Sequence, residues 1–156
     1  MVGAMHNISA GIPYAMSSIK KAKRPNQGIS LDTCILIIDD DRRSSLALSF
    51  MLGVRGYEEV RAVRSAARAV AIAGSFLPGI VFLDLDLPAT DTLDLARQLV
   101  RAARNKPLRM IALTSTVEHP WRELARQAGF ERFLVKPSEQ AEVDKILRLP
   151  ADTAAA

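Results

Sequence analysis

Four short apolar runs in this chain each end in polar side chains, and these side chains together could hold a cation and a phosphoryl group. In chain order, the runs and their polar endings are 34–38 with Asp39-Asp40-Asp41, 80–83 with Asp84, 110–113 with Thr114-Ser115, and 133–135 with Lys136-Pro137. If the runs are neighbouring parallel strands, their ends converge on one edge of the sheet, where open α/β folds bind ligands. Three carboxylates, a hydroxyl and an ammonium would then share one small space.

The carboxylates are suited to a hard divalent cation. Asp39 and Asp40 would lie beside Asp84, and Mg²⁺ fits because it takes one or two protein carboxylates and keeps several waters. An Asp after a strand can instead cap the following helix, a role that we assign to Asp41. For Asp39 and Asp40 alone the two roles are equally supported, and the other strand endings favour the metal.

Asp84 has the chemistry of a phosphoryl acceptor. A carboxylate beside a cation can attack phosphorus and form an acyl phosphate, while Lys136 and Thr114 could stabilise the charge on the phosphoryl oxygens. Each has a simpler alternative, since Thr114 could cap a helix and Lys136 could be a solvated charge. The occurrence of all of them at strand ends, in this order, favours the chemical interpretation.

The composition is that of an ordinary globular chain. Its 156 residues are 49% hydrophobic and 24% charged, which suits one domain with a proper core. The net charge of +4 does not indicate nucleic-acid binding, because much of the excess comes from the cluster at 20–24 and no aromatic residues interleave with the other arginines. A single cysteine excludes an internal disulfide and a multi-cysteine metal site.

Export and membrane features are absent from the sequence pattern. No run approaches the roughly 18 apolar residues of a membrane span, and the basic residues follow the first mildly apolar stretch instead of preceding it. We therefore expect a cytoplasmic protein with no membrane contact.

Three segments follow from the composition along the chain. Residues 1–30 are rich in Gly, Ser and Asn and predict a flexible leader. Residues 31–149 alternate strand-like and helix-like segments and predict the folded domain, and 150–156 predict a frayed tail. Nothing after 149 could form a recognition helix, so we expect no DNA binding by this chain.

The alternation predicts five β-α units. The expected strands lie at about 34–38, 58–63, 80–84, 108–114 and 131–135, and the expected helices at about 42–54, 65–76, 91–103, 119–128 and 138–149. Helical spacing predicts buried faces that include Leu46, Phe50 and Val54 in the first helix, Val100 in the third and Leu124 in the fourth. The nearly continuous apolar strands require helices on both sides of the sheet. The expected fold class is α/β, a doubly wound parallel sheet in a three-layer sandwich.

On these motifs, the chain from about residue 31 to 149 resembles a stand-alone response-regulator receiver domain of bacterial two-component signalling. The resemblance implies a flavodoxin-like sheet of five strands in the order 2-1-3-4-5, flanked by five helices. It implies that Asp84 accepts a phosphoryl group from a sensor histidine kinase or phosphotransfer protein. It further implies that Asp39, Asp40, Asp84 and the backbone carbonyl of Asp86 bind Mg²⁺.

The family's switch implies roles for two further residues. Thr114 would move toward the phosphoryl group and Phe133 would rotate inward, changing the surface of the fourth helix, fifth strand and fifth helix. Output would pass by contact with a downstream protein. The sequence does not determine whether this face forms a homodimer. It also does not identify the kinase, the stimulus or the lifetime of the phosphoryl group.

Two alternatives remain at this point. A haloacid-dehalogenase-like phosphatase also uses an Asp-x-Asp pair, and Asp84 and Asp86 have that spacing. In such phosphatases, however, the acidic pair follows the lysine in the sequence, whereas Asp39 and Asp40 precede Lys136 here. A receiver fold kept only for binding, never phosphorylated, is the other. We expect a receiver that assists its own phosphorylation and hydrolysis and is not a conventional multiple-turnover enzyme.

Overall fold

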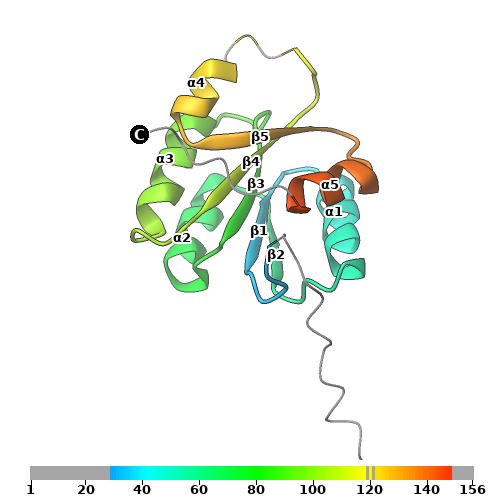
Figure 1. Ribbon diagram of the computed structural model, residues 1–156. Coiled ribbons are helices and arrows are strands. Elements are labelled where there is room, and N and C mark those ends of the chain that lie inside the picture. Colours follow the sequence, from blue (N-terminus) through cyan, green and yellow to red (C-terminus); the bar gives the residue numbers. More distant parts are fainter. Residues whose placement is uncertain (1–28, 119, 121, 149–156) are drawn as a thin grey trace, which may run out of the picture.

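The computed structural model describes residues 29–118, 120 and 122–148, and within them five strands alternate with five helices (Figure 1). The strands are β1 Ile35–Ile38, β2 Val60–Val63, β3 Ile80–Asp84, β4 Arg109–Thr114 and β5 Phe130–Val135. The helices are α1 Arg42–Val54, α2 Ala66–Phe76, α3 Thr92–Ala102, α4 Arg122–Gln127 and α5 Gln140–Arg148. The predicted β-α alternation is therefore confirmed.

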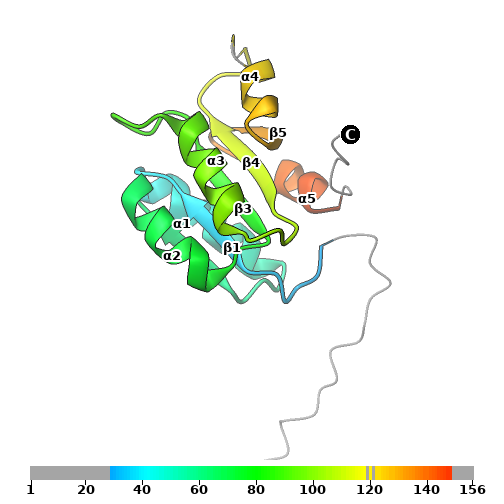
Figure 2. The ribbon, with the colours of Figure 1, turned by 90° about the vertical axis from the view of Figure 1, so that its left-hand side faces the viewer.

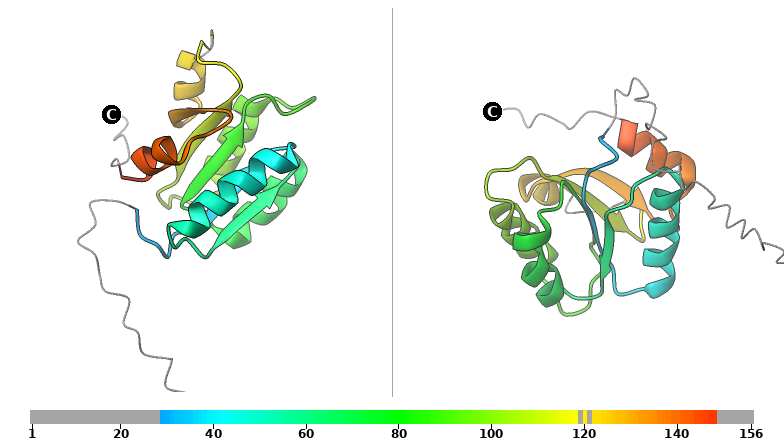
Figure 3. Two further views of the ribbon diagram at one scale, coloured as in Figure 1. Left: turned by 90° about the vertical axis from the view of Figure 1, so that its right-hand side faces the viewer. Right: turned by 90° about the horizontal axis from the view of Figure 1, so that it is seen from below.

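The five strands form one parallel sheet in the order β2-β1-β3-β4-β5, as predicted. Helices α1 and α5 cover one face of the sheet, and α2, α3 and α4 lie on the other (Figures 2 and 3). In β1, the central residues alternate between the two sides. Ile35 and Ile37 pack in the α1–α5 core, and Leu36 and Ile38 pack in the opposite core. All four β1 side chains are buried, which explains why the strand is apolar without a break.

The helix that follows the acidic residues begins where the sequence predicts. Asp41 is the N-cap of α1, and its side chain accepts a hydrogen bond from the Arg43 N–H at 2.8 Å. This bond satisfies one of the free donors at the helix start. Asp41 therefore caps the helix, whereas the side chains of Asp39 and Asp40 remain available for a site at the sheet edge.

The predicted buried face of α1 is wrong. The side chains that pack in the core are Leu48 and Leu52, whereas Leu46, Phe50 and Val54 are 57%, 73% and 63% exposed. Both sets repeat every four residues, so helical spacing fits them equally. An exposed apolar stripe, formed by Leu46, Phe50 and Val54, therefore runs along the outside of α1.

Two further inward assignments are also wrong. Val100 in α3 is 44% exposed and Leu124 in α4 is 52% exposed. The buried α3 positions include Leu95 and Leu99, and the α4 core contact is Ala125. In each helix an apolar residue next to the exposed one, Leu99 or Ala125, packs in the core instead.

The predicted leader and tail lie largely outside the described residues. Among the described residues of the predicted leader, Ile29 packs against the α1–α5 core, and its N–H donates to the Leu147 carbonyl at 3.3 Å. None of the helices in the described ranges has the length and apolar character that a membrane crossing requires.

Candidate functional site

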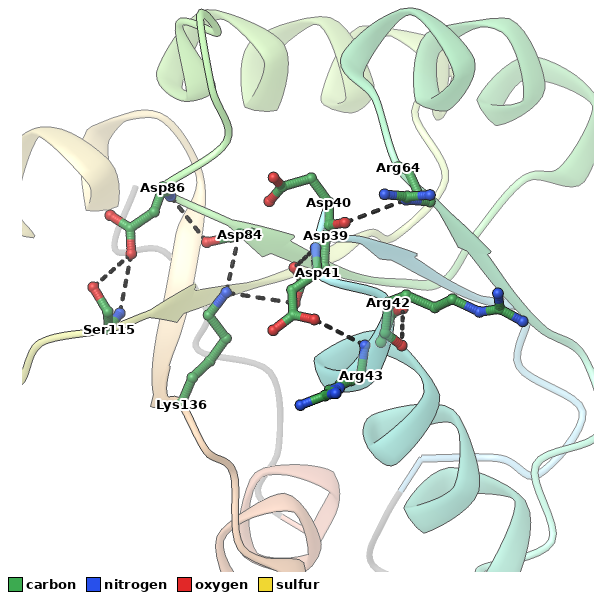
Figure 4. Close-up of polar contacts among 11 residues, drawn as sticks. Asp39, Asp40, Asp41, Arg42, Arg43, Arg64, Asp84, Asp86, Ser115 and Lys136 are labelled. Atoms are coloured by element: carbon green, nitrogen blue, oxygen red, sulfur yellow. Dashed lines mark hydrogen bonds and ion pairs between the residues drawn. The ribbon is translucent and has the colours of Figure 1, made fainter.

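The carboxyl ends of β1, β3 and β5 bring Asp39, Asp84 and Lys136 together at one edge of the sheet (Figure 4). Side chains alternate along a strand, so each of these residues continues the row that faces α1 and α5. That row contains Ile37, Phe82 and Leu134 two positions earlier in the respective strands. Three side chains from distant parts of the sequence therefore converge because the strands are parallel and in register.

Lys136 joins the two buried carboxylates. Its Nζ atom donates to Asp84 Oδ2 at 2.9 Å and lies 3.5 Å from Asp39 Oδ2. Asp39 is fully buried and Asp84 is 1% exposed. Carboxylates at this depth need a cation close by, because water cannot stabilise their charge.

The site fits a divalent cation on its own geometry. Oxygen atoms of Asp39, Asp40 and Asp84 lie within 4.8 Å of one another. Asp39 Oδ1 accepts the Asp41 N–H at 2.9 Å, whereas its Oδ2 atom is buried without a hydrogen-bond partner. A buried carboxylate oxygen that accepts no hydrogen bond and lies beside two other carboxylates is suited to a hard cation that takes oxygen ligands.

The electrostatics of the pocket favour added positive charge. Burial raises the pKa of Asp84 above its ordinary value, although the Asp86 N–H and Lys136 oppose this effect, and the charge of Asp39 adds to the rise. Burial also acts to lower the pKa of Lys136. The hydrogen bond and charge of Asp84, together with Asp39, outweigh it, so the lysine pKa is raised. Lys136 is therefore held as a cation, while the carboxylates still repel one another.

Thr114 lies at the same sheet edge, but its hydroxyl is not directed at Asp84. Thr114 is 1% exposed, and its Oγ1 atom donates to the Thr116 carbonyl at 3.3 Å and accepts the Thr116 N–H at 3.2 Å. The backbone of Thr114 is fixed separately, because its carbonyl accepts the Lys136 N–H at 2.8 Å. The hydroxyl of Thr114 is thus bound to the loop that follows β4.

Asp86 is bound on two sides. Its N–H donates to Asp84 Oδ1 at 2.9 Å, and its carboxylate turns to Ser115 (Figure 4). The carboxylate of Asp86 is not among the three that could share a metal. The role predicted for its backbone carbonyl as a metal ligand stays a prediction.

Phe133 faces the α4 side of the sheet, away from Lys136. The Arg122 guanidinium lies 4.5 Å from the centre of the Phe133 ring, and Phe133 is partly buried against the core on that side. A cation over the face of an aromatic ring is attracted by the ring's electrons. Arg122 therefore contacts the residue that the sequence predicts as part of a switch.

Comparison with known proteins agrees with this arrangement. The family model of the response regulator receiver domain matches residues 35–148. The chain belongs to this family. Receivers are not conventional enzymes, so the phosphatase alternative is set aside.

Three relatives illustrate the match. The receiver is 32% identical over 103 residues to the transcriptional regulatory protein PdtaR of Mycobacterium tuberculosis, covering 66% of this chain and 49% of PdtaR. It therefore spans about half the length of that relative. It is also similar to a Burkholderia pseudomallei response regulator with a phosphorylated aspartic acid, a calcium ion and citrate (26% identity, TM-score 0.66, 74% and 66% of the two chains).

The third relative carries a metal. It is the receiver domain of a sensor histidine kinase from Pseudomonas aeruginosa PAO1, solved with a magnesium ion coordinated in its active-site cleft. The two chains are 30% identical with a TM-score of 0.63, and the match covers 74% of this receiver and 94% of that domain.

Two contacts at the site were not predicted from the sequence. Ser115 binds Asp86, and Arg64 donates from Nε to the Asp40 carbonyl at 3.2 Å. The only signal for Ser115 is its position directly after Thr114 at a strand end. Arg64 follows β2, whose end lies beside β1 in the sheet, so strand order could have indicated it.

Proposed function

We propose that this receiver accepts a phosphoryl group on Asp84, with Mg²⁺ bound by Asp39, Asp40 and Asp84. The donor would be a phosphohistidine of a sensor histidine kinase or phosphotransfer protein. One observation carries the proposal: a buried carboxylate held by Lys136 lies within 4.8 Å of two further carboxylates. A metal site alone would not require the lysine, and a structural ion pair would not require three acids.

Each residue of the site would have a different role in phosphoryl transfer. An oxygen of Asp84 forms the new bond to phosphorus, the bond from phosphorus to the donor nitrogen breaks, and the imidazole leaves with that electron pair. Mg²⁺, when bound, neutralises negative charge on the transferring oxygens. Lys136 contributes a second cation from the α1–α5 side, and Thr114 can supply a hydroxyl from the opposite side.

The output would pass through the surface of α4, β5 and α5. Thr114 and Phe133 would be the switch, because both face the α4 side of the sheet edge and Phe133 reaches the surface. Leu124 in α4 and Val117 in the segment before α4 are 52% and 69% exposed, and they give this surface and its border apolar contact area. A downstream protein is the expected partner, while homodimer formation and a cytoplasmic location remain predictions.

The donor protein would approach along α1. The apolar stripe of Leu46, Phe50 and Val54 starts one turn after Asp41, close to the acidic pocket. Arg42 and Arg43 are exposed at the same end, and α1 contains no acidic residue. This surface suits a helix with an apolar face and flanking carboxylates better than a second copy of the same basic helix.

Incubation with acetyl phosphate and Mg²⁺, followed by intact mass, tests the phosphoacceptor. We expect one phosphoryl adduct in the wild type and in Asp94→Ala, which removes an α3 carboxylate that is not part of the acidic cluster, and none in Asp84→Ala. An adduct that persists in Asp84→Ala would overturn the assignment. No adduct in any variant would favour the alternative of a receiver fold used only for binding.

A further inference from the structure

Two hydrogen bonds at the mouth of the acidic pocket join the loops after β3 and β4. Asp86 Oδ2 accepts from Ser115 Oγ at 2.7 Å and from the Ser115 N–H at 3.1 Å (Figure 4). Asp86 lies two residues after Asp84, and Ser115 directly follows Thr114. The pair therefore connects the loop that carries the acceptor to the loop that carries the hydroxyl.

The loop held by Asp86 keeps the Thr114 hydroxyl turned away from Asp84. Thr114 Oγ1 exchanges hydrogen bonds with the backbone of Thr116, and Thr116 Oγ1 does the same with Glu118 at 3.2 Å in each direction. For Thr114 to donate to a group on Asp84, its hydroxyl must leave the Thr116 carbonyl. The loop that begins with Ser115 must then shift.

We infer that Asp86 and Ser115 form a latch that holds this loop in its resting position and so opposes the movement of Thr114. The inference rests on the proposed phosphorylation of Asp84. A phosphoryl group there carries about two negative charges in place of the single charge of the carboxylate, and it brings three acceptor oxygens close to the Asp86 carboxylate. Charge repulsion and competition for hydrogen-bond donors both weaken the latch, which couples phosphorylation to loop release. Asp86 and Ser115 are thus positioning residues.

The hydroxyl of Ser115 gives the cleanest test. Ser115→Ala removes the 2.7 Å bond and keeps the backbone bond, Ser115→Thr keeps a hydroxyl, and neither alters a carboxylate near the metal. The first measurement is hydrogen exchange at the Thr116 and Glu118 amides without a phosphoryl group. We expect Ser115→Ala to raise both exchange rates about three- to tenfold, the range for loss of one charge-assisted bond at an exposed position, and Ser115→Thr to restore them.

The second measurement is a titration with beryllium trifluoride and Mg²⁺, followed by amide chemical shifts. This ion takes the place of a phosphoryl group on a carboxylate. We expect Ser115→Ala to reach half saturation at a concentration about three- to tenfold lower than the wild type, because less of the binding energy is used to release the loop. In a Thr114→Val background, Ser115→Ala should have no such effect, since the latch acts through the Thr114 hydroxyl.

The outcomes separate the latch from the phosphoacceptor. If the wild type binds the ion but Ser115→Ala behaves identically or binds more weakly, the latch is overturned and the phosphoacceptor stands. If no variant binds the ion, the latch and the phosphoacceptor assignment are both overturned. An equal gain in the Thr114→Val background would also overturn the latch, because the effect would then not depend on Thr114.

Discussion

Lys136 donates from Nζ to Asp84 Oδ2 at 2.9 Å and so connects the end of β5 to the end of β3. The contact crosses a sequence separation of 52 residues. It also places a cation beside Asp39, whose second oxygen has no hydrogen-bond partner. The lysine therefore stabilises two carboxylates that would otherwise repel each other inside the protein.

Replacing this lysine should destabilise the metal-free protein. We expect Lys136→Met to lower the free energy of unfolding by about 2–3 kcal/mol in EDTA, somewhat below the cost of breaking a fully buried pair, because the lysine side chain is 19% exposed. Saturating Mg²⁺ should recover most of the loss, since the metal supplies the missing positive charge. Urea denaturation with and without Mg²⁺ measures both effects. Lys106→Met, at an exposed position, is the control, and a loss that Mg²⁺ does not recover would argue against a shared site.

Metal binding should stabilise the wild type as well. Mg²⁺ at about 100 times its dissociation constant should add about 2.7 kcal/mol to the free energy of unfolding, because it binds only the folded carboxylate cluster. Asp39→Asn should lose most of this gain. The matched control is Asp32→Asn, which is exposed and remote from the sheet edge. Thermal denaturation over a Mg²⁺ series gives the comparison, and equal gains in both variants would exclude Asp39 as a ligand.

The positions of the strands, and of the polar residues at their ends, could be predicted from the sequence. Short, unbroken apolar runs with polar endings predict parallel strands covered on both sides, and parallel strands bring their ends to one edge. That reasoning placed Asp39, Asp84 and Lys136 correctly because each belongs to a regular element. Their approach to one another needed only strand order and side-chain alternation.

Helix faces and loop contacts could not be predicted in this way. In α1, the Phe50 stripe and the Leu52 stripe both repeat every four residues and are separated by roughly 160° around the helix axis. The period therefore cannot say which stripe faces the sheet. The bond between Asp86 and Ser115 depends on the conformation of two loops, and no periodicity describes loops.

The raised pKa of Asp84 predicts how stability depends on pH. Because the folded pKa lies above the unfolded one, the folded state binds more protons, and stability falls as pH rises through this interval. In EDTA, Asp84→Asn removes this titration and should be more stable than the wild type at neutral pH, by about 2–6 °C in Tm, the shift that about 1 kcal/mol produces in a domain of this size. The advantage should shrink as pH falls toward the ordinary carboxyl pKa. Tm measured from pH 4 to 7 checks this, and a constant difference would contradict the assigned cause.

Asp144 gives the opposite pH dependence. It is 7% exposed, lies in α5, and accepts hydrogen bonds from the Arg55 guanidinium at the end of α1 and from Gln140 at 3.0 Å. Burial acts to raise the Asp144 pKa, but Gln140, Arg55 and the charge of Arg148 outweigh it, so the pKa is lowered. The contribution of this group to stability is therefore present above the ordinary carboxyl pKa and is lost as pH falls through the lower folded pKa.

Removing the Asp144 carboxylate should loosen the packing of α5 against α1. We expect Asp144→Ala to cost about 1–2 kcal/mol at pH 7, because Arg55 and Gln140 lose their acceptor while the exposed arginine is partly solvated in compensation. Glu142→Ala changes an exposed acid on the same helix and should be nearly neutral. Urea denaturation of the two variants at pH 7 and at pH 3 separates the effects, because protonation of Asp144 in the wild type should reduce the difference at low pH. A loss that is equal at both pH values would mean that packing, and not the ion pair, joins the two helices.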